Sequence, residues 1–237
     1  MALLSNTQKR IFVNSGHWDK DTGVVSKGII ERDEVKKIRD LVSKYLKENE
    51  FEVIEVPDTL DLRRSIDFVN TYVWEKDGGL ALDIHLNWSG GMTTDVRGVE
   101  VYSGDSLQEK AQANIISEIM ANYMEIPNRG WKSQTDSAWG SLGWVSQVKC
   151  WSHVIECLYL SHPEDRKLIE QNEHIKIAKG IVAGVMRLYD ATPRPSVLET
   201  HTILPIDLEI SLKNKMIELM SKVVELLKQL LKVKNKK

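Results

Sequence analysis

Ile11-Phe12-Val13-Asn14-Ser15-Gly16-His17 is the stretch of sequence that decides the fold. Its three consecutive apolar residues predict a short buried strand, and the polar residues that follow predict a turn. A helix is predicted from about Ile30 to Asn49, because apolar residues recur there with helical spacing. A buried strand that leads through a turn and a loop into an amphipathic helix is the repeating unit of an α/β protein.

The same alternation continues through the next 140 residues. Further strands are predicted at 51–56, 80–86, 97–102 and 154–160, and further helices at 62–73, 107–124 and 164–189. The segment 128–149 is interpreted as a long loop that is rich in Gly and Ser. Strands that alternate with helices predict an α/β fold, in which a twisted, mostly parallel central sheet carries helices on both faces.

Ala191-Thr192-Pro193-Arg194-Pro195-Ser196 ends this alternation, because two prolines so close together cannot continue a helix. We therefore expect a main domain at 1–190, a Pro-containing linker at 191–206 and a C-terminal amphipathic helix at 207–237. Apolar residues in this helix recur in steps of four and three, as in the heptads of a coiled coil. They are Leu212, Met216, Leu219, Val223, Leu226, Leu230 and Val233.

The apolar stripe of the C-terminal helix is broad and requires a cover. Self-association of the chain through 207–233, or docking on the main domain, is favoured. A membrane surface is an alternative, although Glu209, Glu218 and Glu225 argue against a purely basic membrane helix. A core helix of the same domain is the other alternative.

The composition excludes several classes of protein. The chain has 34 acidic and 32 basic residues, so its net charge is close to zero. It therefore lacks the strong positive field that is typical of nucleic-acid-binding proteins. The two cysteines, Cys150 and Cys157, are expected to be buried free thiols. No segment reads as a secretory signal or reaches transmembrane length, so we expect synthesis in the cytoplasm without a signal peptide.

Four residues, His17, Glu31, His85 and Glu156, stand where a predicted strand ends or a helix begins. Such positions build the sites of open α/β sheets. Two histidines and one carboxylate are a standard ligand set for catalytic zinc, and a second carboxylate can serve as the base. Glu156 interrupts an apolar run, so it requires either a partner, such as a structural salt bridge, or a chemical role. Each histidine taken alone is more commonly a surface or hydrogen-bonded residue.

The chain resembles the zinc-dependent N-acetylmuramoyl-L-alanine amidases of the family-3 type over about residues 9–189. The matching segments, in order, are IFVNSGH at 11–17, DTG at 21–23, Glu31, DIHLN at 83–87, GVEVY at 98–102 and VIECLYLSHPED at 154–165. The resemblance implies that His17, Glu31 and His85 bind one zinc ion per chain and that Glu156 is the catalytic acid/base. It also implies a substrate, the amide that joins N-acetylmuramic acid to L-alanine in bacterial peptidoglycan.

Trp18 departs from the family pattern, which has a small residue after the first histidine. A large ring there would narrow the site or stack on a sugar. Trp18, Asn87 and Trp88 are therefore candidate substrate-binding residues. Trp88, Trp131, Trp139 and Trp144 either line a glycan groove or anchor loops.

Other polar residues near these segments are given structural or surface roles. Glu100 is expected to have a structural partner, and His153 to face away from the ligands. His162, His174 and His201 are interpreted as surface residues.

The leading hypothesis is a zinc amidase that lyses cells as an endolysin does, acting on the cell wall after release. One alternative is a catalytically degenerate wall-binding or scaffold protein that assembles through the C-terminal helix. Another alternative is a zinc peptidase of different specificity.

Overall fold

The computed structural model of the protein describes residues 2–4, 9–90, 95–138 and 140–192. The predicted helix at 207–237 and nearly all of the predicted linker at 191–206 lie outside the described residues. Both therefore stay predictions. Within the described residues, no helix combines the length and the apolar character needed to cross a membrane.

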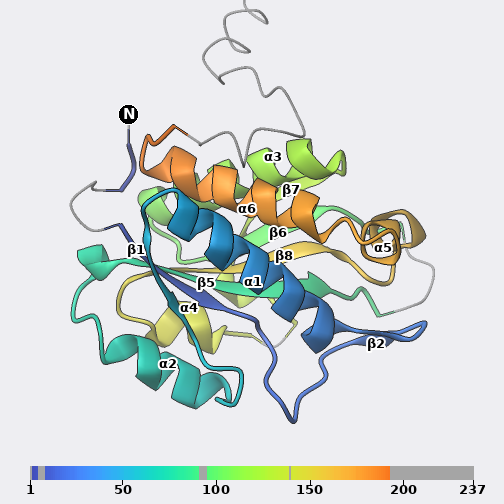
Figure 1. Ribbon diagram of the computed structural model, residues 1–237, viewed down its shortest axis with the longest axis horizontal. Helices are drawn as coiled ribbons and strands as arrows, with labels where there is room; N and C mark the ends of the chain where they lie inside the picture. The colour runs from blue at the N-terminus through green and yellow to red at the C-terminus, as the bar shows by residue number, and fades with distance from the viewer. Residues whose placement is uncertain (1, 5–8, 91–94, 139, 193–237) are drawn as a thin grey trace, which may run out of the picture. The chain divides into compact units, whose positions relative to one another are not determined.

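A mostly parallel six-stranded sheet forms the centre of the main domain and confirms the predicted fold class (Figure 1). Its order is β4-β1-β5-β8-β6-β7. Strands β4, β1, β5 and β8 run parallel, whereas β6 runs antiparallel to β8, and β7 runs parallel to β6. The strands are β1 (Arg10–Asn14), β4 (Glu52–Glu55), β5 (Leu80–Asn87), β6 (Val99–Ser103), β7 (Asn128–Ser133) and β8 (Trp151–Tyr159).

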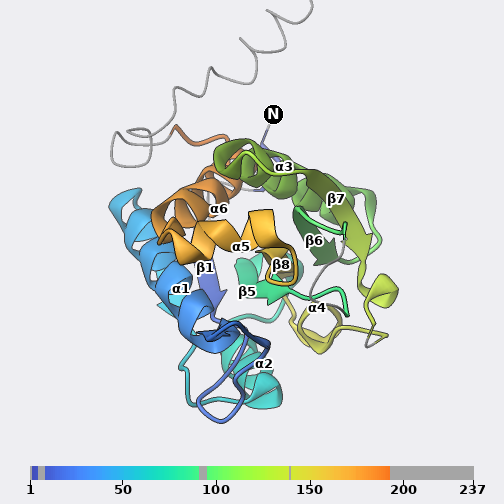
Figure 2. The ribbon, with the colours of Figure 1, turned by 90° about the vertical axis from the view of Figure 1, so that its right-hand side faces the viewer.

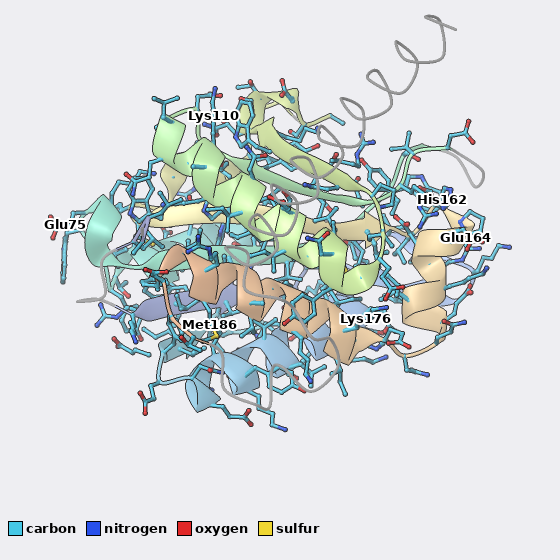
Figure 3. All side chains as sticks on the ribbon, turned by 90° about the horizontal axis from the view of Figure 1, so that it is seen from above. Glu75, Lys110, His162, Glu164, Lys176 and Met186 are labelled. Atoms are coloured by element: carbon cyan, nitrogen blue, oxygen red, sulfur yellow. The ribbon has the colours of Figure 1, made fainter. Side chains whose placement is uncertain are left out.

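Helices cover both faces of this sheet, as predicted (Figures 1 and 2). On one face lie α1 (Glu31–Glu48), α3 (Leu107–Met124) and α6 (His174–Leu188), and Figure 3 shows α3 and α6 side by side. On the other face lie α2 (Leu62–Asn70) and α4 (Gly143–Gln147). The remaining helices are α5 (Pro163–Glu170) and the short 3-10 helices η1 (Lys76–Gly78) and η2 (Gln134–Asp136).

Strand alternation divides the core into two layers, because successive side chains point to opposite faces. Ile11 and Val13 pack in the layer of α1, α3 and α6, while Phe12 packs in the layer of α2 and α4. All three side chains are fully buried. The buried free thiols Cys150 and Cys157 confirm the prediction made for them.

The prediction of a long loop at 128–149 is wrong. The segment contains β7, η2 and α4. Strand β7 reads NRGWKS and lies at the edge of the sheet, where no other strand of the described residues pairs with its outer side. Its polar sequence therefore lacks the apolar alternation that predicts a strand.

Two further boundaries differ from prediction. The predicted helix at 164–189 is divided into α5 and α6, and Asn172 in the connection has a φ of 60°. Asparagine tolerates this left-handed conformation, which a continuous helix does not contain. The loop predicted between the first strand and the first helix contains β2 (Val25–Ser26), which pairs antiparallel with β3 (Ile29–Ile30).

Candidate metal centre

The face of the sheet that carries α2 and α4 has an apolar half and a polar half. Phe12 on β1 and Ala81 on β5 are paired in register and belong to the apolar half. Two positions further along the same strands, Asn14 is paired with Asp83. His85 follows on the same face of β5, since side chains two positions apart share a face. The carboxyl-terminal halves of these strands therefore present polar groups.

His17, Glu31 and His85 converge at this polar half. His17 lies in the turn after β1, Glu31 is the first residue of α1, and His85 lies on β5. One possible ligand atom from each lies within 4.8 Å of the others. His17 Nε2 is 3.0 Å from Glu31 Oε1, and His85 Nδ1 is 3.3 Å from the same oxygen. Among the described residues, this is the one group of three His, Cys, Asp or Glu side chains close enough to share a metal ion.

The Glu31 carboxylate is held by backbone as well as by the two imidazoles. Leu86 N donates to Oε1 and Val24 N donates to Oε2, each at 2.9 Å. Burial by itself raises the pKa of Glu31, but the hydrogen bonds with His17 and His85 outweigh it and hold the pKa well below its usual range. Glu31 is therefore charged at neutral pH, as a metal ligand must be.

Each imidazole also contacts an aspartate through its second ring nitrogen. His17 Nδ1 is 2.9 Å from Asp21 Oδ2, and His85 Nε2 is 3.3 Å from Asp83 Oδ2. Asn14 Nδ2 in turn donates to Asp83 Oδ1 at 2.7 Å. Carboxylates in this position fix the orientation of a ligand imidazole and raise its basicity. Neither aspartate was predicted to have this role, although both lie in the matching segments and Asp83 shares a strand face with His85.

Two glycines let the backbone close around the three side chains. A Cβ atom on Gly23 would meet His17 Nε2 and Glu31 Oε2. A Cβ atom on Gly16 would lie 2.7 Å from His85 Cε1. Both glycines have φ in the left-handed region, at 59° and 69°. The donor set, one carboxylate and two imidazoles in a tight cradle, fits a zinc ion.

Glu156 lies beside this group on β8, where it is the register partner of His85. Its Oε2 atom is buried and has no hydrogen-bond partner among the described residues. Burial raises the pKa of Glu156 to about 8. A divalent cation nearby would lower it again, because positive charge favours the carboxylate form. Burial therefore makes this carboxyl group hold a proton more readily than an exposed glutamate does.

Glu100 on β6 is the register partner of Glu156 and therefore lies beside it on the same face of the sheet. Its Oε1 atom accepts hydrogen bonds from Tyr102 Oη (3.0 Å), Tyr159 Oη (2.9 Å) and Asn87 Nδ2 (2.8 Å). Burial and the negative charge of Glu100 raise the pKa of both tyrosines, so both remain hydrogen-bond donors. The structural role predicted for Glu100 is confirmed. Asn87, which was predicted to bind substrate, donates a hydrogen bond from its side-chain amide to Glu100.

The tryptophans take different places. Trp18 lines a depression of about 350 Å³ together with His17, Asp19 and Arg32. Trp144 is a fully buried residue of the α2/α4 layer. Trp88 and Trp131 are partly buried and pack on the α1/α3/α6 layer, and Trp139 lies outside the described residues. Substrate binding by Trp18 and Trp88 stays a prediction.

The other histidines among the described residues do not join the cluster. His153 packs in the α1/α3/α6 layer, where its Nε2 atom is 3.0 Å from Gln112 Oε1. The surface assignment of His174 is wrong, because it is buried and its Nε2 atom lies 2.6 Å from Glu34 Oε2. This contact joins α6 to α1. His162 accepts a hydrogen bond from Glu164 N at the start of α5, and His201 lies outside the described residues.

Comparison with known proteins gives a consistent result. The chain matches the family model described as N-acetylmuramoyl-L-alanine amidase over residues 11–187. It resembles the catalytic domain of CwlV, an N-acetylmuramoyl-L-alanine amidase from Bacillus (Paenibacillus) polymyxa var. colistinus. The identity is 24%, the TM-score is 0.66, and the match covers 78% of this chain and 100% of that chain.

Two further solved structures share the fold. One is the N-acetylmuramoyl-L-alanine amidase from Clostridium difficile 630, with 22% identity, a TM-score of 0.65, and coverage of 76% of this chain and 96% of that chain. The other is the catalytic domain of the CD27L endolysin that targets the same species, with 22% identity, a TM-score of 0.61, and coverage of 76% and 98%. The search of curated proteins gives no match.

Proposed function

Because the chain belongs to the N-acetylmuramoyl-L-alanine amidase family, we propose that it uses a zinc ion to hydrolyse the amide between N-acetylmuramic acid and L-alanine in bacterial peptidoglycan. One observation carries the proposal. His17, Glu31 and His85 offer three ligand atoms within 4.8 Å of one another, and the unpartnered acid Glu156 lies on the adjacent strand in register with His85.

In this proposal, His17, Glu31 and His85 hold the zinc ion, and Asp21 and Asp83 orient the two imidazoles. A zinc ion held by these residues would polarise the scissile carbonyl and lower the pKa of a bound water toward about 7. Glu156 takes a proton from the attacking water at its buried oxygen and gives it to the amine nitrogen of L-alanine as the bond breaks. General acid/base work of this kind contributes roughly 10²–10⁴ in rate.

The proposal is tested with purified peptidoglycan as the substrate, together with the metal content of the purified protein. We expect about one zinc ion per chain, loss of hydrolysis after chelation, and recovery when zinc is restored. Mass spectrometry should find stem peptides with a free L-alanine amino group and glycan strands with free lactyl carboxyl groups.

Other results would favour the alternatives. Cleavage at another amide identifies a peptidase of different specificity. Binding to walls without cleavage identifies a scaffold protein. Cleavage that survives chelation contradicts the zinc mechanism.

The biological use that we propose is cell lysis, with residues 1–190 as the catalytic domain and 207–233 as a segment that joins copies of the chain. The heptad pattern of the second segment supports self-association. Light scattering on the full chain should give an oligomer, and Leu219→Lys together with Leu226→Lys should give a monomer. Equal masses for the two proteins would contradict this use of the segment.

A further inference from the structure

Arg129 lies on a bulge in β7, and its side chain contacts β6. Val99 pairs with Asn128 and Glu100 pairs with Gly130, so Arg129 is the extra residue between two consecutive pairs. Gly130 has a φ of 71°, which fits the bulge. Bulges redirect side chains and occur often beside active sites. Here Arg129 Nε donates to Glu100 Oε2 at 2.8 Å.

Register places this arginine close to the proposed reacting centre. His85, Glu156 and Glu100 are partners across the adjacent strands β5, β8 and β6, and partners in register share a face of the sheet. Two strand spacings separate His85 from Glu100, a distance of about 10 Å. Two extended residues of a peptide span about 7 Å. A side group on the residue after L-alanine can therefore reach the neighbourhood of Arg129.

The side chains around Arg129 suit the binding of an anion. Glu100 is 2% exposed and is held by Asn87, Tyr102 and Tyr159, so it anchors Arg129 firmly. The Arg129 guanidinium also lies 5.4 Å from the centre of the Tyr159 ring. A guanidinium carries several N–H donors, and Glu100 accepts the one on Nε. The Arg129 side chain remains 34% exposed, so donors stay accessible to a ligand.

We propose that Arg129 binds a carboxylate on the stem-peptide residue that follows L-alanine, and that Glu100 positions Arg129 for this contact. The inference rests on the proposed amidase function and defines its substrate more narrowly, as peptidoglycan in which that carboxylate is free. Arginine suits the role because its planar donors match both oxygens of a carboxylate.

The test compares two muramoyl tripeptides in which D-glutamate follows L-alanine and continues through its γ-carboxyl group. The α-carboxyl group of the glutamate is free in one substrate and amidated in the other. We expect the zinc-loaded wild-type protein to favour the free acid in kcat/KM by roughly ten- to hundredfold, the range for a charge-assisted hydrogen bond. Arg129→Met should bring the ratio close to one, mainly by raising KM for the free acid, and Arg129→Lys should restore part of it.

Two more variants separate recognition from folding. Glu100→Gln should raise KM for the free acid and leave KM for the amidated substrate unchanged, whereas a merely structural defect lowers activity on both. Arg63→Met, which removes an exposed cation on α2, should leave the ratio unaltered. The ratio does not depend on the amount of folded protein, so partial misfolding of a variant does not obscure it.

Equal hydrolysis of the two substrates by the wild type overturns the role of Arg129 and leaves the amidase function intact. Discrimination that persists in Arg129→Met overturns it as well. Hydrolysis of neither substrate overturns the proposed function, and the inference falls with it.

Discussion

At the scale of single residues, Glu156 keeps a carboxyl oxygen buried without a hydrogen-bond partner among the described residues. Such burial costs stability, because the group loses its water without compensation. A residue that serves only the fold is normally paired in such a place. The unpaired oxygen therefore fits the acid/base role that we propose for Glu156.

Glu156→Gln is expected to keep the metal and lose hydrolysis. The amide has nearly the same shape but accepts no proton, so kcat should fall by roughly 10²–10⁴. Zinc content should stay at the wild-type value, and the melting temperature should not fall. Glu164→Gln, at a half-exposed position on α5, is the matched control and should behave as the wild type. Wild-type kcat in Glu156→Gln would show that another group is the base.

Gly23→Ala is expected to weaken zinc binding strongly, because the new Cβ would collide with His17 Nε2 and Glu31 Oε2. Gly28→Ala is the matched control, since Gly28 also has a positive φ, at 83°, but has no atom within 4 Å of the added Cβ. Both variants should lose about 1–2 kcal/mol of stability to backbone strain. Only Gly23→Ala should lose zinc in equilibrium dialysis. Equal zinc affinity in the two variants would contradict this account of the cradle.

The sequence predicted which residues would stand at strand ends, and His17, Glu31 and His85 do converge there. It did not predict the arginine that contacts Glu100. Arg129 stands at the bulge between the pairs Val99–Asn128 and Glu100–Gly130, and its contact with Glu100 depends on that local register. Local pattern does not reveal a bulge in a polar edge strand, so this part of the site required the register of β6 and β7.

At the scale of elements, the strong periodic segments were predicted well and the short polar ones were not. Helix α3 spans Leu107–Met124, the range predicted for it. Strand β7 and helix α4 were missed, because their stability comes from tertiary contacts rather than from a local pattern. The break between α5 and α6 was missed because neither glycine nor proline marks it.

Helix α3 begins with a reciprocal cap that should contribute measurably to stability. Ser106 Oγ accepts from Glu109 N at 3.2 Å, and the Glu109 carboxylate accepts from Ser106 N at 3.3 Å. Ser106→Ala should therefore lower the free energy of unfolding by about 1 kcal/mol in urea denaturation. Ser146→Ala, at an exposed position within α4, is the control and should change it much less. If Ser106→Ala leaves the free energy of unfolding unchanged, the remaining contacts of Glu109 are enough to cap the helix.

At the scale of the main domain, the two faces of the sheet are covered unequally. Helices α1, α3 and α6 form one continuous layer, whereas α2 and α4 cover mainly the apolar half of the other face. His85 and Glu156 lie on the polar half of that face, beyond the apolar side chains on which α2 and α4 pack. The polar half of the face therefore carries two of the residues to which the proposed function assigns metal binding and acid/base work.

The continuous layer also contains a buried histidine that should make the domain sensitive to acid. Burial lowers the pKa of His153 from its ordinary 6.5 to about 4. Between these pH values the unfolded chain binds the proton and the folded chain does not, so stability falls as pH decreases. The loss should begin below about pH 6.5, end near pH 4 and reach about 3 kcal/mol.

His153→Gln tests this because glutamine keeps an amide donor for Gln112 and does not titrate. Urea denaturation of the metal-free protein at several pH values gives the free energy of unfolding for both chains. The difference between wild type and variant cancels the contributions of His17 and His85, which both chains share. That difference should be constant above about pH 6.5. As the pH falls toward 4, the free energy of unfolding should decrease more for the wild type than for the variant. Parallel curves across this range would mean that His153 is protonated in the folded domain and that its surroundings tolerate the charge.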